Sequence, residues 1–174
     1  MSAALENWYP MLFPSERGPD ACLRAMAALT GGEPTPDPHV TLAYLTVSPV
    51  TEAQLAQLRT LAGPAVPIRA EAPYSLTEDP HPLFGYTLSL RVAPHPAFTW
   101  WRVAVRAILD PGGGRPQAYI PHMQAVRHMA VPPAAALDRL RGRDWSVAFE
   151  ATTLIVSQRV GDTFVPRVEH RFGR

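Results

Sequence analysis

Two segments of the sequence begin a strand-like run with the dipeptide Pro-His, and this internal repeat constrains the fold more than any other feature. Pro38-His39 is followed by Val-Thr-Leu-Ala-Tyr-Leu, and Pro121-His122 is followed by Met-Gln-Ala-Val-Arg. A helical pattern and a loop of turn-forming residues precede each run, and another helical pattern follows it. The repeat predicts an α+β chain of two pseudo-symmetric lobes, each with an antiparallel sheet and packed helices.

The expected elements follow from apolar periodicity and from the positions of capping and turn residues. Helical patterns cover 15–30, 51–61, 97–109 and 133–141, with Ser15 and Thr51 as expected N-caps. Strand patterns cover 7–13, 39–45, 66–76, 84–92, 119–127, 145–158 and 163–172, with a turn at Gly161-Asp162. At 174 residues the chain is expected to form a single bilobal domain, 1–174.

Composition excludes several classes of function. All 16 basic residues are Arg, so lysine chemistry such as a Schiff base or a Walker A loop is excluded. The single cysteine, Cys22, excludes an intramolecular disulfide and a multi-cysteine zinc site. The net charge of +1 excludes nucleic-acid binding by bulk charge, although a local phosphate site stays open. No membrane-spanning run and no signal-peptide pattern stand out, so a soluble cytoplasmic protein is expected.

The two Pro-His runs also carry the candidate chemistry. Because alternate residues of a strand share a face, His39 should project with Thr41, and His122 with Gln124. A pseudo-twofold axis between the lobes would bring both pairs to one cleft. Two imidazoles can then act as general base and general acid near neutral pH, while Thr41 and Gln124 hold the phosphoryl oxygens of a phosphodiester. No spacing predicts a metal site, and no cofactor is expected.

Two further side chains are candidates for substrate binding, each with a plain structural alternative. Arg127 can donate to phosphate, but it lies on the opposite face of an ideal strand from His122 unless a bulge intervenes. A surface arginine is the alternative. Tyr44 can stack on a base, with a core or rim tyrosine as the alternative. For His39 and His122 themselves, the alternative is two unrelated histidines at strand starts.

The run from His39 resembles the first His-x-Thr/Ser motif of the two-histidine (2H) phosphoesterase superfamily, in its LigT-like or 2′-5′ RNA ligase branch. The run from Pro121 is similar to the second motif, Pro-His-hydrophobic-Thr-hydrophobic-Ala-Arg, and the separation of the two motifs fits. The opening strand into Phe13-Pro14-Ser15 and the segment from 154 to 172 are similar too. The resemblance therefore covers essentially the whole chain.

The resemblance implies a bilobal fold with the motifs facing across a cleft, and metal-independent cleavage of cyclic or 2′-5′ phosphodiesters. The expected partner is a nucleotide or an RNA terminus with a 2′,3′-cyclic phosphate, reversible 2′-5′ joining is a further possibility, and a monomer is expected. His122 is expected to activate water and His39 to protonate the leaving oxygen, with the reverse assignment open.

One position departs from the family pattern, because Gln124 stands where the second motif has Thr or Ser. A glutamine amide still donates a hydrogen bond, but its head lies farther from the backbone than a hydroxyl. The sequence therefore leaves open a nucleotide- or RNA-end-binding protein of the same fold with weak or lost catalysis. An unrelated α+β protein is the third hypothesis, and widely separated histidines would favour it.

Overall fold

The computed structural model describes residues 4–15, 18–113 and 120–172. The helices in these ranges are α1 (Asp20–Thr30), α2 (Glu52–Arg59), α3 (Pro96–Leu109) and α4 (Pro133–Leu140). The strands are β1 (Glu6–Pro14), β2 (Glu33–Pro34), β3 (Val40–Thr41), β4 (Leu45–Val47), β5 (Val66–Tyr74), β6 (Tyr86–Val92), β7 (His122–Met129), β8 (Val147–Val160) and β9 (Thr163–Arg171). None of these helices is long and apolar enough to cross a membrane.

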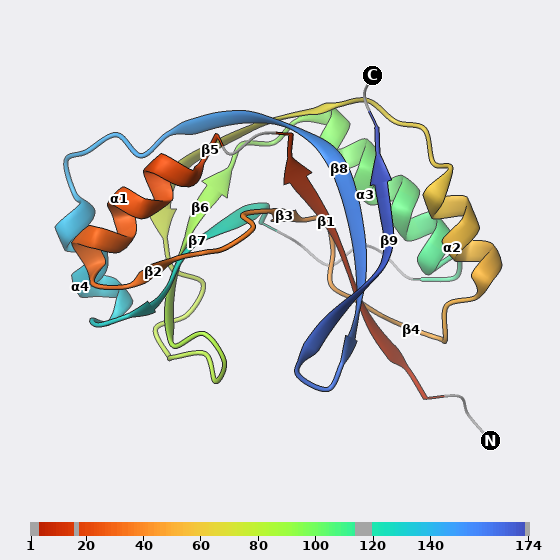
Figure 1. Ribbon diagram of the computed structural model, residues 1–174, viewed down its shortest axis with the longest axis horizontal. Helices are drawn as coiled ribbons and strands as arrows, with labels where there is room; N and C mark the ends of the chain where they lie inside the picture. Colours follow the sequence, from red (N-terminus) through yellow and green to blue (C-terminus); the bar gives the residue numbers. More distant parts are fainter. Residues whose placement is uncertain (1–3, 16–17, 114–119, 173–174) are drawn as a thin grey trace.

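The strands pair antiparallel in the order β4-β1-β3-β7-β6-β5-β8-β9, and β2 pairs with β7. Because β8 also pairs with β1, the path closes into a ring that passes through β3 and β7. In Figure 1 the strands form an arch, with β7, β6 and β2 on one side and β1, β8, β9 and β4 on the other. This is the two-lobed α+β architecture expected from the repeat.

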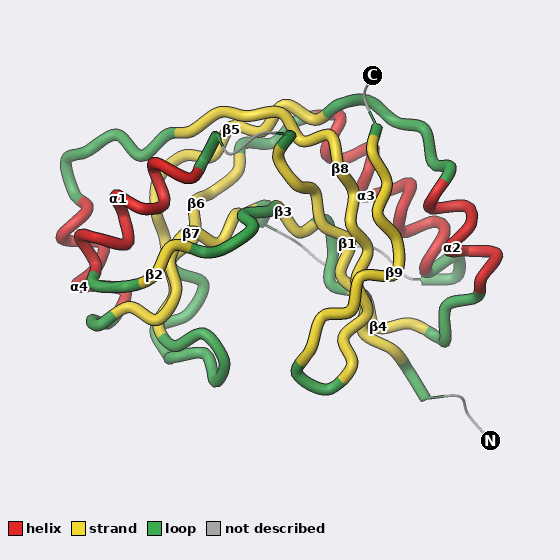
Figure 2. Tube along the Cα trace, viewed as in Figure 1, coloured by secondary structure: helices red, strands yellow, loops and turns green. Residues whose placement is uncertain are grey.

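The helices cover the two flanks of this arch (Figure 2). On one flank α1 and α4 pack against each other, with α1 against β7 and α4 against β5 and β6; on the other, α2 packs against α3 and β9. We call these the α1/α4 lobe and the α2/α3 lobe. Each lobe combines one helix from each half of the sequence, so the repeat along the chain does not coincide with the lobes.

Local sequence signals explain the α2/α3 lobe well. Thr51 caps α2, because its hydroxyl accepts from the N–H of Gln54 at 3.3 Å while the Gln54 side chain accepts from the Thr51 N–H at 2.9 Å. The core face of α3 carries Phe98, Trp101, Val105 and Leu109, all buried. The fully buried Trp101 indole donates to the Pro64 carbonyl at 2.8 Å, so its polar atom is satisfied.

Two expected elements differ in the structure. The run 39–45 splits into β3 and β4, because the chain leaves β3 after Thr41 and the N–H of Leu42 donates to the Pro10 carbonyl at 2.8 Å. The first helix begins at Asp20 with Pro19 at its N-cap, so the prediction of Ser15 as the cap is wrong. Ser15 instead extends the β1–β8 pairing, its N–H donating to Glu150 at 2.8 Å. The expected strand start at 119 lies outside the described residues, and β7 begins at His122.

Candidate active site

The two Pro-His motifs lie on strands that are direct neighbours. β3 pairs antiparallel with β7, and Val40 lies opposite Met123. Both of these side chains are completely buried in the core. Because side chains alternate along extended backbone, His39, directly before β3, and Thr41 on β3 project from the other face, as do His122 and Gln124 on β7. The register therefore brings the four side chains together around a local twofold axis between Val40 and Met123.

These four side chains and Tyr44 line one cavity of about 600 Å³, a size typical of small-ligand sites. The loop between β5 and β6 supplies one wall and the β8–β9 hairpin supplies another, and both loops project to the same side of the arch in Figure 1. The loop wall contributes Leu76, Thr77, His81 and Phe84; the hairpin wall contributes Arg159 and Phe164. The cavity thus has a polar floor and largely apolar walls.

The two histidines are anchored in the same way. Nδ1 of His39 lies 3.0 Å from the Asp37 carbonyl oxygen, and Nδ1 of His122 lies 2.9 Å from the Ile120 carbonyl oxygen. A carbonyl oxygen only accepts, so each Nδ1 carries the proton and donates. Nε2 is therefore the atom that gains or loses a proton at both residues, as acid–base catalysis requires.

Burial lowers the pKa of both histidines. For His39 the hydrogen bond to Asp37 opposes that shift, and the charge of His122 lowers the pKa further. For His122 the hydrogen bond to Ile120 is the opposing effect. Both imidazoles therefore resist protonation, and because two charged imidazoles repel each other, the pair holds one proton more readily than two.

Tyr44 lies next to His122 in the candidate site. Its hydroxyl oxygen is 3.5 Å from Nε2 of His122. Desolvation raises the pKa of Tyr44, and a hydrogen bond with Thr41 opposes part of that shift. The phenol is thus protonated near neutral pH and can donate. The Tyr44 ring also meets Tyr9 edge to face, with centroids 5.6 Å apart.

Gln124 has hydroxyl groups beside it on the neighbouring strand. Ser89 of β6 lies opposite Gln124, and Thr87 and Ser89 both line the cavity. Ser89 is buried, at 3% exposed. The alternation of Thr87 and Ser89 with the buried Leu88 and Leu90 was the sequence signal for these polar groups, but nothing in the local sequence ties β6 to β7.

Arg127 lies outside the cavity lining, although β7 contains the bulge that would turn it. A register shift between Leu88 and Ser89 of β6 gives β7 one extra residue, and by alternation Arg127 then shares the face of Gln124. Its guanidinium nevertheless pairs with Glu33 of β2, with 3.4 Å between Nη2 and Oε2. The structure therefore brings five of the six candidate residues to the cavity. Arg127 does not line the cavity and pairs with Glu33 of β2 instead.

The cavity also contains residues that the sequence analysis did not select. Arg159 is the arginine that lines it, and its side chain donates to the Gly161 carbonyl at 2.9 Å and pairs with Asp162 at 3.3 Å. Tyr9 packs edge to face on Phe164, with centroids 4.9 Å apart. These side chains come from β1 and from the β8–β9 hairpin, far in sequence from either motif, so only the β1–β8 pairing reveals them.

Comparisons with known proteins bear on the fold. No protein-family model matches the sequence, and no curated protein matches it. Structures of E. coli LigT without ligand and with NADP+ match with TM-scores of 0.61 and 0.62, at 14% and 15% identity, over 99% and 98% of this chain and 100% and 99% of theirs. A crystal structure of a phosphoesterase matches with a TM-score of 0.62 at 14% identity, over 97% of this chain and 99% of its own. The chain therefore has the LigT-like two-histidine phosphoesterase fold over essentially its whole length.

Proposed function

We propose that this protein is a metal-independent phosphodiesterase that opens 2′,3′-cyclic phosphates at nucleotides or RNA termini. The observation that carries the proposal is the β3–β7 register, which gathers two imidazoles and two hydrogen-bonding side chains on one face that lines the cavity. The E. coli LigT structures with 3′-AMP, ATP and NADP+ are those of a nucleotide-binding protein with this fold, which supports a nucleotide as the ligand class.

The reaction adds one water across a P–O bond. One neutral imidazole takes a proton from water as the oxygen attacks phosphorus, and the other, protonated, gives its proton to the ribose oxygen as the P–O bond breaks. The product is an open phosphomonoester, and the pair has exchanged its protonation states. We assign the base to His39 and the acid to His122, the reverse of the preferred assignment from sequence, because His39 packs on the apolar Phe13 ring whereas the Tyr44 hydroxyl lies 3.5 Å from Nε2 of His122.

Thr41 and Gln124 are proposed to hold the non-bridging phosphoryl oxygens while charge builds on them. Thr41 lies beside His122 and Gln124 beside His39 in the β3–β7 register, so each imidazole has one donor next to it. Arg159 supplies a positive charge to the cavity wall, and Tyr44 and Phe164 offer rings for a nucleobase. Reversible 2′-5′ joining is the same chemistry with a 5′-hydroxyl in place of water as the nucleophile on the cyclic phosphate, and its reverse cleaves the 2′-5′ linkage to the cyclic phosphate and the 5′-hydroxyl.

The first test is turnover of nucleoside 2′,3′-cyclic phosphates in the presence of a chelator, with His39→Ala and His122→Ala beside the unaltered protein. We expect turnover that survives the chelator and is lost in both variants. His128→Asn is the matched control, because His128 is exposed on the same strand, lines no described cavity and has φ of 51°, which Asn tolerates. Turnover retained in both alanine variants would overturn the proposal.

The second candidate function is binding of a nucleotide or RNA end without turnover, and Gln124 is the observation that favours it. Gln124→Thr separates the two, because it restores the hydroxyl of the family motif. A gain in rate identifies Gln124 as the residue that limits chemistry in an enzyme. Tight binding of adenosine 3′-phosphate, with no turnover in either form, establishes the binding protein.

We further propose that the protein acts as a monomer in the cytoplasm, as the sequence predicts. Light scattering coupled to size-exclusion chromatography tests the first part, because the monomer has a mass of 19.1 kDa. Fractionation of cells tests the second.

A further inference from the structure

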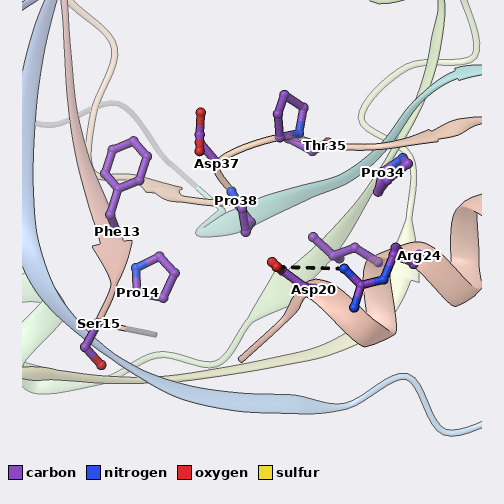
Figure 3. A pocket seen from close by; sticks show the side chains of 11 residues that line it. Phe13, Pro14, Ser15, Asp20, Arg24, Pro34, Thr35, Asp37 and Pro38 are labelled. Atoms are coloured by element: carbon purple, nitrogen blue, oxygen red, sulfur yellow. Dashed lines mark ion pairs between the residues drawn. The ribbon is translucent and has the colours of Figure 1, made fainter. Parts of the chain in front are cut away.

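A second cavity, of about 520 Å³, adjoins the proposed active site (Figure 3). The end of β1, the first turns of α1 and the proline-rich segment 34–38 enclose it. It shares three lining residues with the active-site cavity: Phe13, Pro36 and Asp37. The two cavities therefore lie next to each other, with these three residues at their common boundary.

Thr35 gives this cavity an unsatisfied polar group. The residue is only 8% exposed, it lines the cavity, and its hydroxyl has no hydrogen-bond partner among the described residues. Burial of a hydroxyl without a partner is unfavourable, and a ligand that hydrogen-bonds it would recover that free energy. The Thr35 N–H donates to the Ala125 carbonyl of β7 at 3.0 Å, so this hydroxyl is held in a fixed position next to the strand of Gln124.

The walls of the cavity suit a flat, uncharged group. Phe13 and the rings of the prolines in 34–38 form apolar surfaces, and proline contributes no N–H. The Phe13 ring also packs against His39, with centroids 5.1 Å apart and planes tilted by 34°. Phe13 thus stands between the two cavities and contacts the proposed base directly.

The charges of the cavity disfavour a phosphate inside it. Asp20 and Asp37 supply two carboxylates, and Arg24 supplies one guanidinium, which is 3.9 Å from Asp20. Figure 3 shows this ion pair at the start of α1. The described residues of the lining therefore carry one net negative charge, and their carboxylates can accept from the N–H groups of a nucleobase or the hydroxyls of a ribose.

We propose that this second cavity binds the nucleoside preceding the reacting nucleotide, so that the substrate is an RNA end of two or more nucleotides rather than a cyclic mononucleotide. The inference rests on the proposed function. The linking phosphate then lies at the junction beside Phe13, and the penultimate base lies among the prolines with Thr35 as a hydrogen-bond partner. Asp37 contributes to both cavities, because it lines the second cavity and its backbone carbonyl accepts the hydrogen bond that orients His39.

The test compares three substrates that differ by one group at a time. They are adenosine 2′,3′-cyclic phosphate, the same compound with a 5′-phosphate, and the dinucleotide ApA with a 2′,3′-cyclic phosphate. We expect kcat/KM for the dinucleotide to exceed that of the 5′-phosphorylated mononucleotide by about tenfold or more, because stacking of one base contributes about 1–3 kcal/mol. Equal values for these two substrates would overturn the inference while leaving the phosphodiesterase intact.

Thr35→Val assigns any preference to this cavity, because valine keeps the shape and removes the hydroxyl. We expect the ratio of dinucleotide to mononucleotide kcat/KM to fall by about three- to tenfold. The matched control is Thr30→Val, since Thr30 is also fully buried but lines neither cavity and donates to the Met26 carbonyl within α1. A ratio that falls equally in both variants counts against the assignment.

A complete lack of turnover would overturn the proposed function, and binding then decides on the second cavity. The probes are ApA 3′-phosphate and adenosine 3′,5′-bisphosphate, titrated by calorimetry into the unaltered protein and Thr35→Val. Tighter binding of the dinucleotide that weakens in Thr35→Val supports the cavity as a nucleoside site. Equal affinities for both probes overturn it.

Discussion

The two histidines of the candidate site make the same hydrogen bond, but the backbone segments that carry them differ. Each imidazole donates from Nδ1 to the carbonyl two residues earlier, at 3.0 Å for His39 and 2.9 Å for His122. His122 begins an eight-residue strand inside the sheet, whereas His39 precedes a strand of two residues and follows a proline-rich loop. That loop holds Asp37 at φ 48°, a left-handed conformation that Asp tolerates better than most residues.

The two imidazoles also differ in the side chains that contact them. Tyr44 lies 3.5 Å from His122, and the Tyr74 ring meets it edge to face with centroids 6.5 Å apart. His39 instead packs on Phe13, which also lines the second cavity. The two imidazoles thus make matching hydrogen bonds but have different neighbouring side chains. Under the proposed function, these neighbours determine which imidazole keeps a proton.

The strongest way to break the symmetry is to remove each imidazole and vary the leaving group. We expect His39→Asn and His122→Asn each to lower kcat/KM on cyclic phosphates by about 10²–10⁴-fold, the usual contribution of a general acid or base. A nitrophenyl phosphodiester needs no proton on its leaving oxygen. His122→Asn should therefore recover most of its loss on that substrate, and His39→Asn should not.

The opposite pattern, with recovery in His39→Asn alone, would reverse the two roles. Recovery in both or in neither would contradict a divided acid–base pair. The double variant gives a further check, because residues that act as one unit lose activity non-additively.

The donor beside each imidazole gives the next effect. Thr41→Val removes a hydroxyl proposed to hold a charged phosphoryl oxygen, and a hydrogen bond to a charged group contributes about 1.5–3 kcal/mol. We expect kcat to fall by about 10–100-fold with a smaller change in KM. A loss confined to KM would place Thr41 in ground-state binding only, and Thr46→Val, at an exposed site outside the cavity, is the control.

The lowered pKa of both imidazoles makes folding stability depend on pH. The unfolded chain takes up protons at its histidines below about pH 6.5, while the folded chain resists protonation at His39 and His122. The free energy of unfolding contributed by this pair should therefore fall as the pH drops below that value, and stay constant above it. Urea unfolding of the unaltered protein and of His39→Asn at several pH values measures it.

His39→Asn and His122→Asn should each flatten this pH dependence, because each removes one imidazole with a lowered pKa and the repulsion between the two. Titration of the two imidazoles by NMR compares their pKa values directly. A His39 that titrates above His122 would contradict the proposed assignment of acid and base.

The smallest effect on activity is expected for Tyr44→Phe, which acts on His122 more than on His39. Tyr44→Phe removes a hydroxyl at 3.5 Å from His122 and keeps the ring. We expect kcat/KM to fall by no more than about fivefold, in keeping with a neutral hydrogen bond of about 1 kcal/mol. The NMR titration of His122 should shift while that of His39 changes less, and an equal shift of both would show that Tyr44 acts on the whole cavity.

Sequence patterns predicted the elements whose signals are local. Thr51 marks the start of α2, and Gly161-Asp162 marks the turn between β8 and β9, as the structure confirms. The spacing of the Pro-His motifs predicted one shared site, and the structure brings His39 and His122 to one cavity. Their roles, and those of Thr41, Tyr44, Gln124 and Arg127, stay predictions.

Long-range pairing determined what the sequence left out. Nothing near Leu42 shows that its N–H will bond to Pro10 and end β3 after two residues. The bulge that turns Arg127 depends on the partner strand β6, and the partner that holds its guanidinium, Glu33, comes from β2. The placement of Arg159 likewise depends on β1 and β8 lying side by side.

The hydrogen-bonded contact between β3 and β7 has a mechanical consequence. In many two-lobed enzymes the reacting groups lie on opposite lobes, and closure of the lobes brings them together. Here the proposed reacting groups lie where the two sides of the arch are joined by strand pairing, because Val40 and Met123 pair directly beneath them. Swinging of the outer loops would widen the mouth of the molecule and leave the spacing of the two imidazoles almost unchanged. Under the proposed function, the entry of an RNA end and the spacing of the two imidazoles would therefore vary independently of each other.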